Sequence, residues 1–156
     1  GAEGPNSETE SSGTYHDIRS FRRAAFSRMS PAVAGQPICS FTVGNICGYV
    51  MENYNPIDCS DDAEDRTYCI STDSNIVDYQ AGANKACKDM GMNLASGQLI
   101  KSFIDSFTGE SKIPNGRYTV SDRPRLAIVN GTNVSYGNAI WTYATEKNPA
   151  VCFSYR

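Results

Sequence analysis

The stretch YQAGANKACKDMGMNL, residues 79–94, decides the fold, because it places a cysteine on the apolar face of an amphipathic helix and then ends that helix at a glycine. Asp78 can cap the helix at its start, and Gly91 supplies the residue that helices commonly use to stop. One helical face collects the apolar residues Tyr79, Ala83, Ala86, Cys87 and Met90. We therefore expect this helix to pack into a core.

The segments around this helix alternate in type. Ser96 can cap a second helix, whose apolar stripe precedes Gly109 and comprises Leu99, Ile100, Phe103, Ile104 and Phe107. Upstream, Gly44-Asn45 predicts a tight turn between two short strands at 38–43 and 46–51. Downstream, runs rich in β-branched and aromatic residues predict strands at 118–120, 126–129, 139–145 and 151–155. This order predicts an α+β fold, with two helices on one side of small antiparallel sheets.

The N-terminal residues differ from this region. Residues 1–13 are small and polar, so we expect a flexible tail. Residues 14–30 predict an extra amphipathic helix that Ser30-Pro31 ends. We expect its apolar face to pack on the domain or on a neighbouring subunit, while its basic face faces solvent or, alternatively, an acidic partner. That basic face carries Arg19, Arg22, Arg23 and Arg28.

Composition narrows the class of protein. A chain of 156 residues has room for one domain with a modest extension. The formal net charge of -3 gives no reason to expect a nucleic-acid partner, which requires clustered basic residues. No apolar run approaches the roughly 18 to 20 residues that span a bilayer, and nothing at the start resembles a signal segment. We expect neither a membrane span nor nucleic-acid binding.

Six cysteines point to an oxidising compartment. They stand at Cys39, Cys47, Cys59, Cys69, Cys87 and Cys152, without a Cys-x-x-Cys pair and with a single histidine, His16, in the chain. Structural zinc sites need four closely grouped thiolates or imidazoles, so a disulfide framework is the better interpretation. This predicts a secreted or cell-surface protein. Six cysteines allow fifteen pairings, although Cys39 and Cys47 are placed to clip the predicted hairpin.

Two further polar features stand out. Asn130 and Asn133 each begin a glycosylation sequon, which is compatible with export. Acidic residues also crowd into one segment, comprising Asp58, Asp61, Asp62, Glu64 and Asp65. A calcium site is one interpretation of that segment, but the spacing does not fit the calcium-loop motif, and we favour a solvated acidic loop. We predict no metal and no cofactor.

From Cys59 to the C-terminus, the chain resembles the C-type lectin-like domain. Cys59 and Tyr68-Cys69 match the cysteines that open the long form of that family. The family's pattern Ala-x-x-x-Cys-x-x-x-Gly-x-x-Leu-Ala is matched from Ala83 to Ala95, and Cys152 lies in the final predicted strand. The resemblance implies Cys87 bonded to Cys152 and Cys59 bonded to Cys69, which leaves Cys39 with Cys47. It also implies domain bounds of 59–156, after a disulfide-clipped hairpin and acidic loop at 37–58.

The resemblance also implies a function. The family's calcium-site motifs, Glu-Pro-Asn, Gln-Pro-Asp and Trp-Asn-Asp, are absent. The chain is therefore similar to the compact version of the fold in bacterial adhesins and in hyaluronan-binding link modules. The function so implied is non-enzymatic extracellular recognition or adhesion, with a protein or glycan ligand at a cell surface and no calcium. The alternative is a structural subunit of an extracellular fibre or pilus-like assembly that self-assembles through the N-terminal helix.

Aromatic residues are the candidate ligand contacts. Tyr136, Trp141 and Tyr143 lie in the region where lectin-like domains present their ligand surface, and exposed aromatic rings can stack on sugars or anchor a protein contact. Strand alternation favours Trp141 in the core instead, and leaves Tyr136 and Tyr143 open. No catalytic constellation stands out. His16 lies in the predicted N-terminal helix, every cysteine already has a plausible partner, and no carboxylate pair is singled out. We predict no enzyme; a secreted enzyme with unrecognised carboxylates is the weakest alternative.

Overall fold

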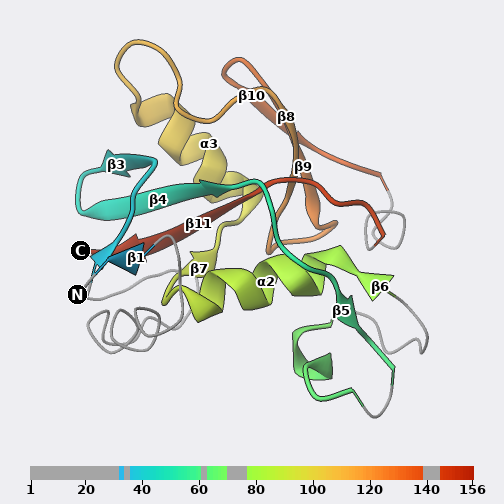
Figure 1. Ribbon diagram of the computed structural model, residues 1–156. Helices are drawn as coiled ribbons and strands as arrows, with labels where there is room; N and C mark the ends of the chain where they lie inside the picture. Colours follow the sequence, from blue (N-terminus) through green and yellow to red (C-terminus); the bar gives the residue numbers. More distant parts are fainter. Residues whose placement is uncertain (1–31, 34–35, 61–62, 70–76, 139–144) are drawn as a thin grey trace. The chain divides into compact units, whose positions relative to one another are not determined.

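The computed structural model describes residues 32–33, 36–60, 63–69, 77–138 and 145–156 (Figure 1). The predicted tail at 1–13, the predicted helix at 14–30 with His16 and its four arginines, and almost all of the predicted strand at 139–145 lie outside these residues. Of the described residues, one unit takes in those up to Tyr49 together with Cys87–Asn93 and Cys152–Arg156. The second unit takes in Val50–Ala86 and Leu94–Val151.

The first unit contains the predicted hairpin as far as Tyr49. Strands β3 (Phe41–Val43) and β4 (Ile46–Met51) pair antiparallel, with Val43 opposite Ile46. The two-residue turn begins at Gly44, whose φ of +59° lies in the left-handed region that glycine enters without strain. Strand β3 starts three residues later than predicted, and a disulfide joins Cys39, just before that strand, to Cys47 within β4. A separate short pair joins β1 (Ala32–Val33) to β2 (Gln36–Pro37).

The C-terminal end of helix α2 (Tyr79–Asp89) also belongs to the first unit, and it ends as predicted. Gly91 adopts a φ of +74°, its N–H donates to the carbonyl of Lys88, and the N–H of Met92 donates to the carbonyl of Cys87. These two bonds form a Schellman motif. Cys87, buried in this last turn, is bonded to Cys152 in strand β11 (Ala150–Tyr155), with 5.5 Å between their Cα atoms.

The second unit holds most of the regular elements. Its short elements are β5 (Ile57–Asp58), the 3-10 helix η1 (Arg66–Tyr68) and β6 (Val77–Asp78). The two-residue strand β7 (Asn93–Leu94) has its first residue in the first unit and its second residue in the second. Helix α3 (Gly97–Ser106) begins as predicted, because Ser96 Oγ accepts a hydrogen bond of 3.0 Å from the N–H of Leu99. It buries Ile100, Phe103 and Ile104 of its predicted apolar stripe.

Strands β8 (Gly116–Thr119), β9 (Leu126–Asn130) and β10 (Asn133–Tyr136) follow α3. They form successive antiparallel pairs, and α3 lies beside β10 (Figure 1). Strand β10 was not among the predicted strands. Its hairpin turns at Gly131-Thr132, where Gly131 has a φ of +63°.

The main sheet has seven strands in the order β10-β9-β8-β11-β4-β3, and β7 pairs with β11 off this path. The prediction of an antiparallel sheet is wrong for one pair, since β8 and β11 run parallel where Ala150 faces Thr119. A tight hairpin forces antiparallel pairing only on strands that it joins directly, and some thirty residues separate β8 from β11. The fold is α+β with a mixed sheet and three disulfides. Among the described residues, no helix has the length and apolar character needed to cross a membrane.

Candidate functional site

The candidate site is a cavity of about 250 Å³ within the second unit. One wall comes from η1 and the residue after it, through Thr67, Tyr68 and Cys69. A second wall comes from α2, through Gln80 and Asn84. Leu94, Val120, Ser121 and Arg125 complete the lining. Most of these side chains carry hydrogen-bonding groups, so the cavity suits a polar ligand.

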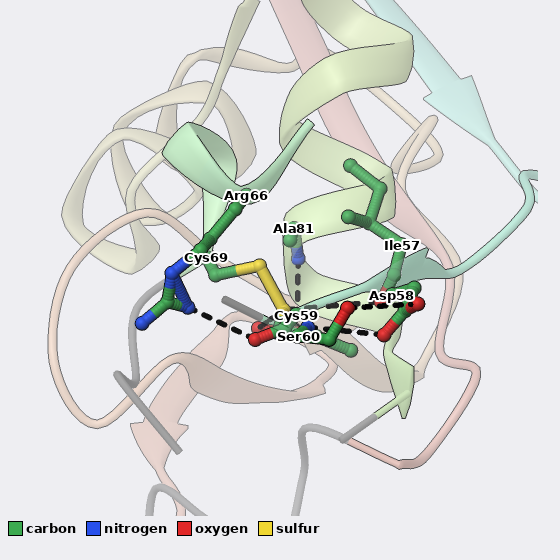
Figure 2. Close-up of a disulfide and its surroundings, with 8 residues drawn as sticks. Ile57, Asp58, Cys59, Ser60, Arg66, Cys69 and Ala81 are labelled. Carbon is green, nitrogen blue, oxygen red and sulfur yellow. Dashed lines mark hydrogen bonds between the residues drawn. A yellow bond between two sulfur atoms is a disulfide. The ribbon is translucent and has the colours of Figure 1, made fainter. Parts of the chain in front are cut away.

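The Cys59–Cys69 disulfide holds the η1 wall in place (Figure 2). Cys59 is buried, and it packs with Ile57 and Ala81 in a small apolar cluster to which Tyr68 and Cys69 also belong. Arg66 reaches back from η1 and donates a hydrogen bond of 2.9 Å from Nη1 to the carbonyl of Cys59. This covalent and polar anchoring fixes the segment that presents Thr67 and Tyr68 to the cavity.

The cap at the start of α2 fixes the part of this helix that lines the cavity. Asp78 Oδ1 accepts a hydrogen bond of 3.0 Å from the N–H of Ala81, which confirms the predicted N-cap. Gln80, in the same first turn, is only 3% exposed. Its Nε2 donates to the carbonyl of Arg125 at 3.0 Å, and this bond fixes which end of the amide is the acceptor. The acceptor, Oε1, is buried and has no hydrogen-bond partner among the described residues.

Arg125 closes the loop between β8 and β9 in a left-handed backbone conformation, with a φ of +77°. Its N–H donates to the carbonyl of Asp122 at 2.7 Å, and its own carbonyl accepts from the N–H of Val120 at 3.2 Å as well as from Gln80. Its guanidinium donates from Nη1 to the carbonyl of Ser121. Its Nε–H is buried without a partner in the described part of the chain. Gln80 and Arg125 both line the cavity, whereas their two unpaired atoms are themselves fully buried.

The charge of the site comes from Arg125. Burial, followed by the nearby charge of Arg123, lowers the pKa of the Arg125 guanidinium, while Asp122 and Asp78 oppose that shift. An arginine starts from so high a value that it stays protonated at neutral pH. Among the nine lining residues Arg125 alone is charged, so the cavity wall carries a net positive charge.

Tyr136, a predicted ligand contact, does not line this cavity. Its hydroxyl donates to Asp122 Oδ2 at 2.5 Å, while Asp122 Oδ1 accepts from the N–H of Gly97 at 2.9 Å. Its ring lies against Gly97, where an added Cβ would meet the Tyr136 hydroxyl at 2.7 Å. Burial and the neighbouring Asp122 carboxylate raise the pKa of Tyr136. In the structure Tyr136 ties the start of α3 to the loop that carries Arg125. Its proposed ligand contact stays a prediction, and Trp141 and Tyr143 lie outside the described residues.

The other predicted sites fall elsewhere. Asn130 and Asn133 are both exposed, at the end of β9 and the start of β10, which leaves glycosylation there a prediction. In the acidic segment, Asp58 accepts hydrogen bonds from the N–H and the hydroxyl of Ser60, and Asp61 and Asp62 lie outside the described residues. One group with metal-ligand spacing occurs in the described part of the chain, formed by Cys59, Cys69 and Asp78. Both of its sulfurs are consumed by the disulfide.

Sequence reasoning missed Gln80 and Arg125. Gln80 directly follows the first residue of the helix and occupies a buried position, where an uncharged amide is unusual and gives a weak signal. Arg125 stands 45 residues away from it along the chain, and no short motif links the two. Only the folded arrangement brings them together. Comparison of the chain with family models, with curated proteins and with solved structures gave no match.

Proposed function

We propose that this chain is a non-enzymatic extracellular recognition module of compact C-type lectin-like fold, which binds a glycan without a calcium ion. The cysteine, helix and turn spacing from Cys59 to Cys152 supports the family assignment. The three disulfide pairs agree with those that the resemblance implied. Disulfides also support an oxidising compartment such as the cell exterior.

The observation that carries this proposal is the polar cavity, in which hydrogen-bonding side chains lie beside the aromatic ring of Tyr68. The hydrogen-bonding side chains are Thr67, Gln80, Asn84, Ser121 and Arg125. Sugar hydroxyls both donate and accept, and they can therefore pair with the donors and acceptors of these side chains. Tyr68, half-buried in the lining, offers an aromatic face of the kind on which sugar rings stack.

The size of the cavity favours a single sugar unit. Its volume of about 250 Å³ falls just below the ~300–1,000 Å³ typical of sites for drug-sized ligands. The lining chemistry favours binding over catalysis. Among the described residues that line it there is no carboxylate, imidazole or free thiol, which are the groups that most often act as general acids, bases or nucleophiles.

The test is a glycan array followed by titration calorimetry on the retained glycan, with the wild type and Gln80→Met. Methionine has a similar length and removes the half-satisfied amide, so we expect binding to fall at least ten-fold while the melting temperature stays within about 3 °C of the wild type. Gln98→Met, at an exposed position of α3, is the matched control. Binding should persist in a calcium chelator.

Three results would overturn the proposal: retention of no glycan, binding that requires calcium, or unchanged affinity in Gln80→Met. If Gln80→Met fails to fold, Asn84→Ala provides a second variant from the same wall, at a half-buried position of α2. Spontaneous polymerisation in sedimentation experiments would favour the fibre-subunit alternative instead.

A further inference from the structure

The proposed function leaves one cluster of potential metal ligands without a role. Cys59 Sγ, Cys69 Sγ and a carboxylate oxygen of Asp78 all lie within 4.8 Å of one another, inside the second unit. Cys59 and Asp78 are both buried, which sets this cluster apart from the exposed acidic groups that occur commonly without an ion. Cys69 is half-buried and lines the cavity, so the cavity gives an ion from solution a route to the cluster.

The distance between sulfur and oxygen in this cluster suits a tetrahedral zinc site. Zn–S bonds of about 2.3 Å and Zn–O bonds of about 2.0 Å place a sulfur and an oxygen ligand about 3.5 Å apart. Cys59 Sγ and Asp78 Oδ2 are 3.7 Å apart. Two sulfur ligands of zinc lie about 3.8 Å apart, whereas any disulfide bond holds them at about 2 Å. The closed bond therefore excludes the ion, and reduction of the bond admits it.

The charges around the cluster favour a divalent cation. Two thiolates and the Asp78 carboxylate carry three negative charges in all, and buried charges are stable only when they are paired or bind a metal. A divalent ion cancels two of these charges. The guanidinium of Arg66 lies beside the cluster, where it donates to the Cys59 carbonyl at 2.9 Å, and it balances the third (Figure 2). Two soft sulfur donors select zinc over calcium and magnesium.

From this geometry we infer that Cys59, Cys69 and Asp78 form a zinc site when the Cys59–Cys69 disulfide is reduced, with water as the fourth ligand. Two molecules of a thiol reductant give two electrons and two protons to the disulfide and are themselves joined as a disulfide. The S–S bond breaks and each cysteine becomes a thiol. Zn²⁺ then displaces both thiol protons as two Zn–S bonds form.

The zinc ion replaces the disulfide as the link that holds the η1 wall of the cavity. Cys69 directly follows η1, and both cysteines are ligands, so the same two residues stay joined in either redox state. Because the binding free energy of a structural metal is also folding free energy, the reduced wall keeps its anchor. The inference does not depend on glycan binding.

The experiment measures how zinc changes the redox equilibrium of each disulfide in the full chain. The protein is equilibrated in glutathione buffers with Zn²⁺, with Ca²⁺ or with a metal chelator. Alkylation and peptide mass spectrometry then give the ratio of reduced to oxidised cysteine in each pair. At free Zn²⁺ of about ten times its Kd, the ratio for Cys59–Cys69 should rise about ten-fold, because the ion binds the reduced pair alone. Ca²⁺ should leave this ratio unchanged.

The Cys39–Cys47 pair is the internal reference. Its cysteines are 8 residues apart, against 10 for Cys59–Cys69, and it belongs to no such ligand group in the described part of the chain. Zinc should therefore leave its ratio unchanged. A second measurement uses Co²⁺ on the reduced wild type. Tetrahedral cobalt with two thiolate ligands gives sulfur-to-metal charge-transfer and visible bands, which the oxidised protein should lack.

Asp78→Asn assigns the carboxylate ligand. Asparagine keeps the helix cap and removes the anionic oxygen, so the affinity of the reduced pair for zinc should fall about ten-fold or more, which is the least that even outer partners of a metal ligand contribute. Asp105→Asn is the matched control, because Asp105 is an exposed carboxylate of α3 that pairs with Lys101. It should keep the full zinc effect. Circular dichroism shows whether each variant is folded.

The outcomes separate this inference from the proposed function. An unchanged ratio at Cys59–Cys69 with zinc overturns the inference, and so does an equal rise at all three disulfides, which shows binding to unfolded thiols. A full zinc effect in folded Asp78→Asn overturns the three-ligand site. If that variant unfolds, the cobalt spectrum of the wild type decides, and absence of the tetrahedral bands overturns the inference. None of these results changes the outcome of the glycan array.

Discussion

Asp78 Oδ2 lies 3.7 Å from Cys59 Sγ, so the side chain that caps α2 also stands beside the Cys59–Cys69 disulfide. Asp78 is almost completely buried, at 1% exposed. Reduction of a disulfide proceeds by attack of an anionic thiolate and releases a second thiolate. A carboxylate at this distance opposes both charges, so Asp78 protects the bond that anchors the η1 wall of the cavity.

Asp78→Asn should therefore accelerate reduction of Cys59–Cys69 by glutathione roughly five-fold. This factor corresponds to the loss of about 1 kcal/mol of repulsion between the Asp78 carboxylate and the thiolates. Asparagine keeps the helix cap, so general unfolding is avoided. Alkylation followed by peptide mass spectrometry measures each disulfide separately, and the rate at Cys39–Cys47 serves as the internal reference. Equal acceleration of all three bonds would show global destabilisation and contradict the electrostatic account.

The three disulfides should contribute unequally to stability. Cys87 and Cys152 are 65 residues apart, against 10 for Cys59–Cys69 and 8 for Cys39–Cys47. Loop-closure entropy then gives about 4 kcal/mol for the long loop and about 2.5 kcal/mol for each short one. Urea unfolding of the three paired Cys→Ala variants measures this order. A Cys87→Ala/Cys152→Ala variant as stable as the other two would contradict it.

The sequence predicted well wherever the signal was local. Asp78 and Ser96 cap their helices, and Gly91 ends α2, because each needs only atoms within a few residues. The disulfide pairs followed from a family resemblance, and they too agree with the structure.

The rest depends on contacts between distant residues. Strand β10 escaped prediction because Asn133–Tyr136 is short and polar, and its pairing with β9 decides its conformation. The parallel pairing of β8 with β11 has no local signal. The cavity depends on a bond between Gln80 and Arg125 that no spacing rule anticipates.

Gly82 should tolerate no side chain, although it lies in the interior of α2. A Cβ at this position would stand 2.0 Å from the backbone carbonyl oxygen of Asn55, and a backbone atom cannot rotate away as a side chain can. On helix propensity alone, Gly82→Ala would raise the free energy of unfolding by up to about 1 kcal/mol. A net loss of stability would therefore come from the steric clash. We expect Gly82→Ala to lower the free energy of unfolding by about 2 kcal/mol or more.

Gly109→Ala is the matched control for Gly82→Ala. Gly109 has a φ of +84° with nothing within 4 Å of an added Cβ, so only backbone strain of about 1 kcal/mol applies. Urea unfolding compares the two variants. A Gly82→Ala protein at least as stable as Gly109→Ala would show that α2 does not approach Asn55 this closely.

Tyr118 should make the protein sensitive to alkali. Burial, with a smaller contribution from the charge of Glu52, raises the pKa of Tyr118 to about 12 from its ordinary 10.0. The folded state thus holds the phenol proton more tightly than the unfolded state does. The resulting stability is fully present below pH 10 and is lost as the pH rises from 10 to 12, by about 2 to 3 kcal/mol in all.

Tyr118→Phe tests this directly. The variant loses the hydrogen bond of 2.5 Å from the Tyr118 hydroxyl to the carbonyl of Pro114, so at pH 7 it should be less stable than the wild type by about 1 kcal/mol. It lacks the titrating phenol, so its stability should fall less between pH 10 and 12, and the two free energies of unfolding should converge or cross there. Urea unfolding at pH 7, 9, 10.5 and 11.5 measures both proteins, and the difference between pH 7 and 9 gives the baseline. Parallel curves across the whole range would mean that the Tyr118 phenol titrates alike in the folded and unfolded chain, which its burial, at 2% exposed, argues against.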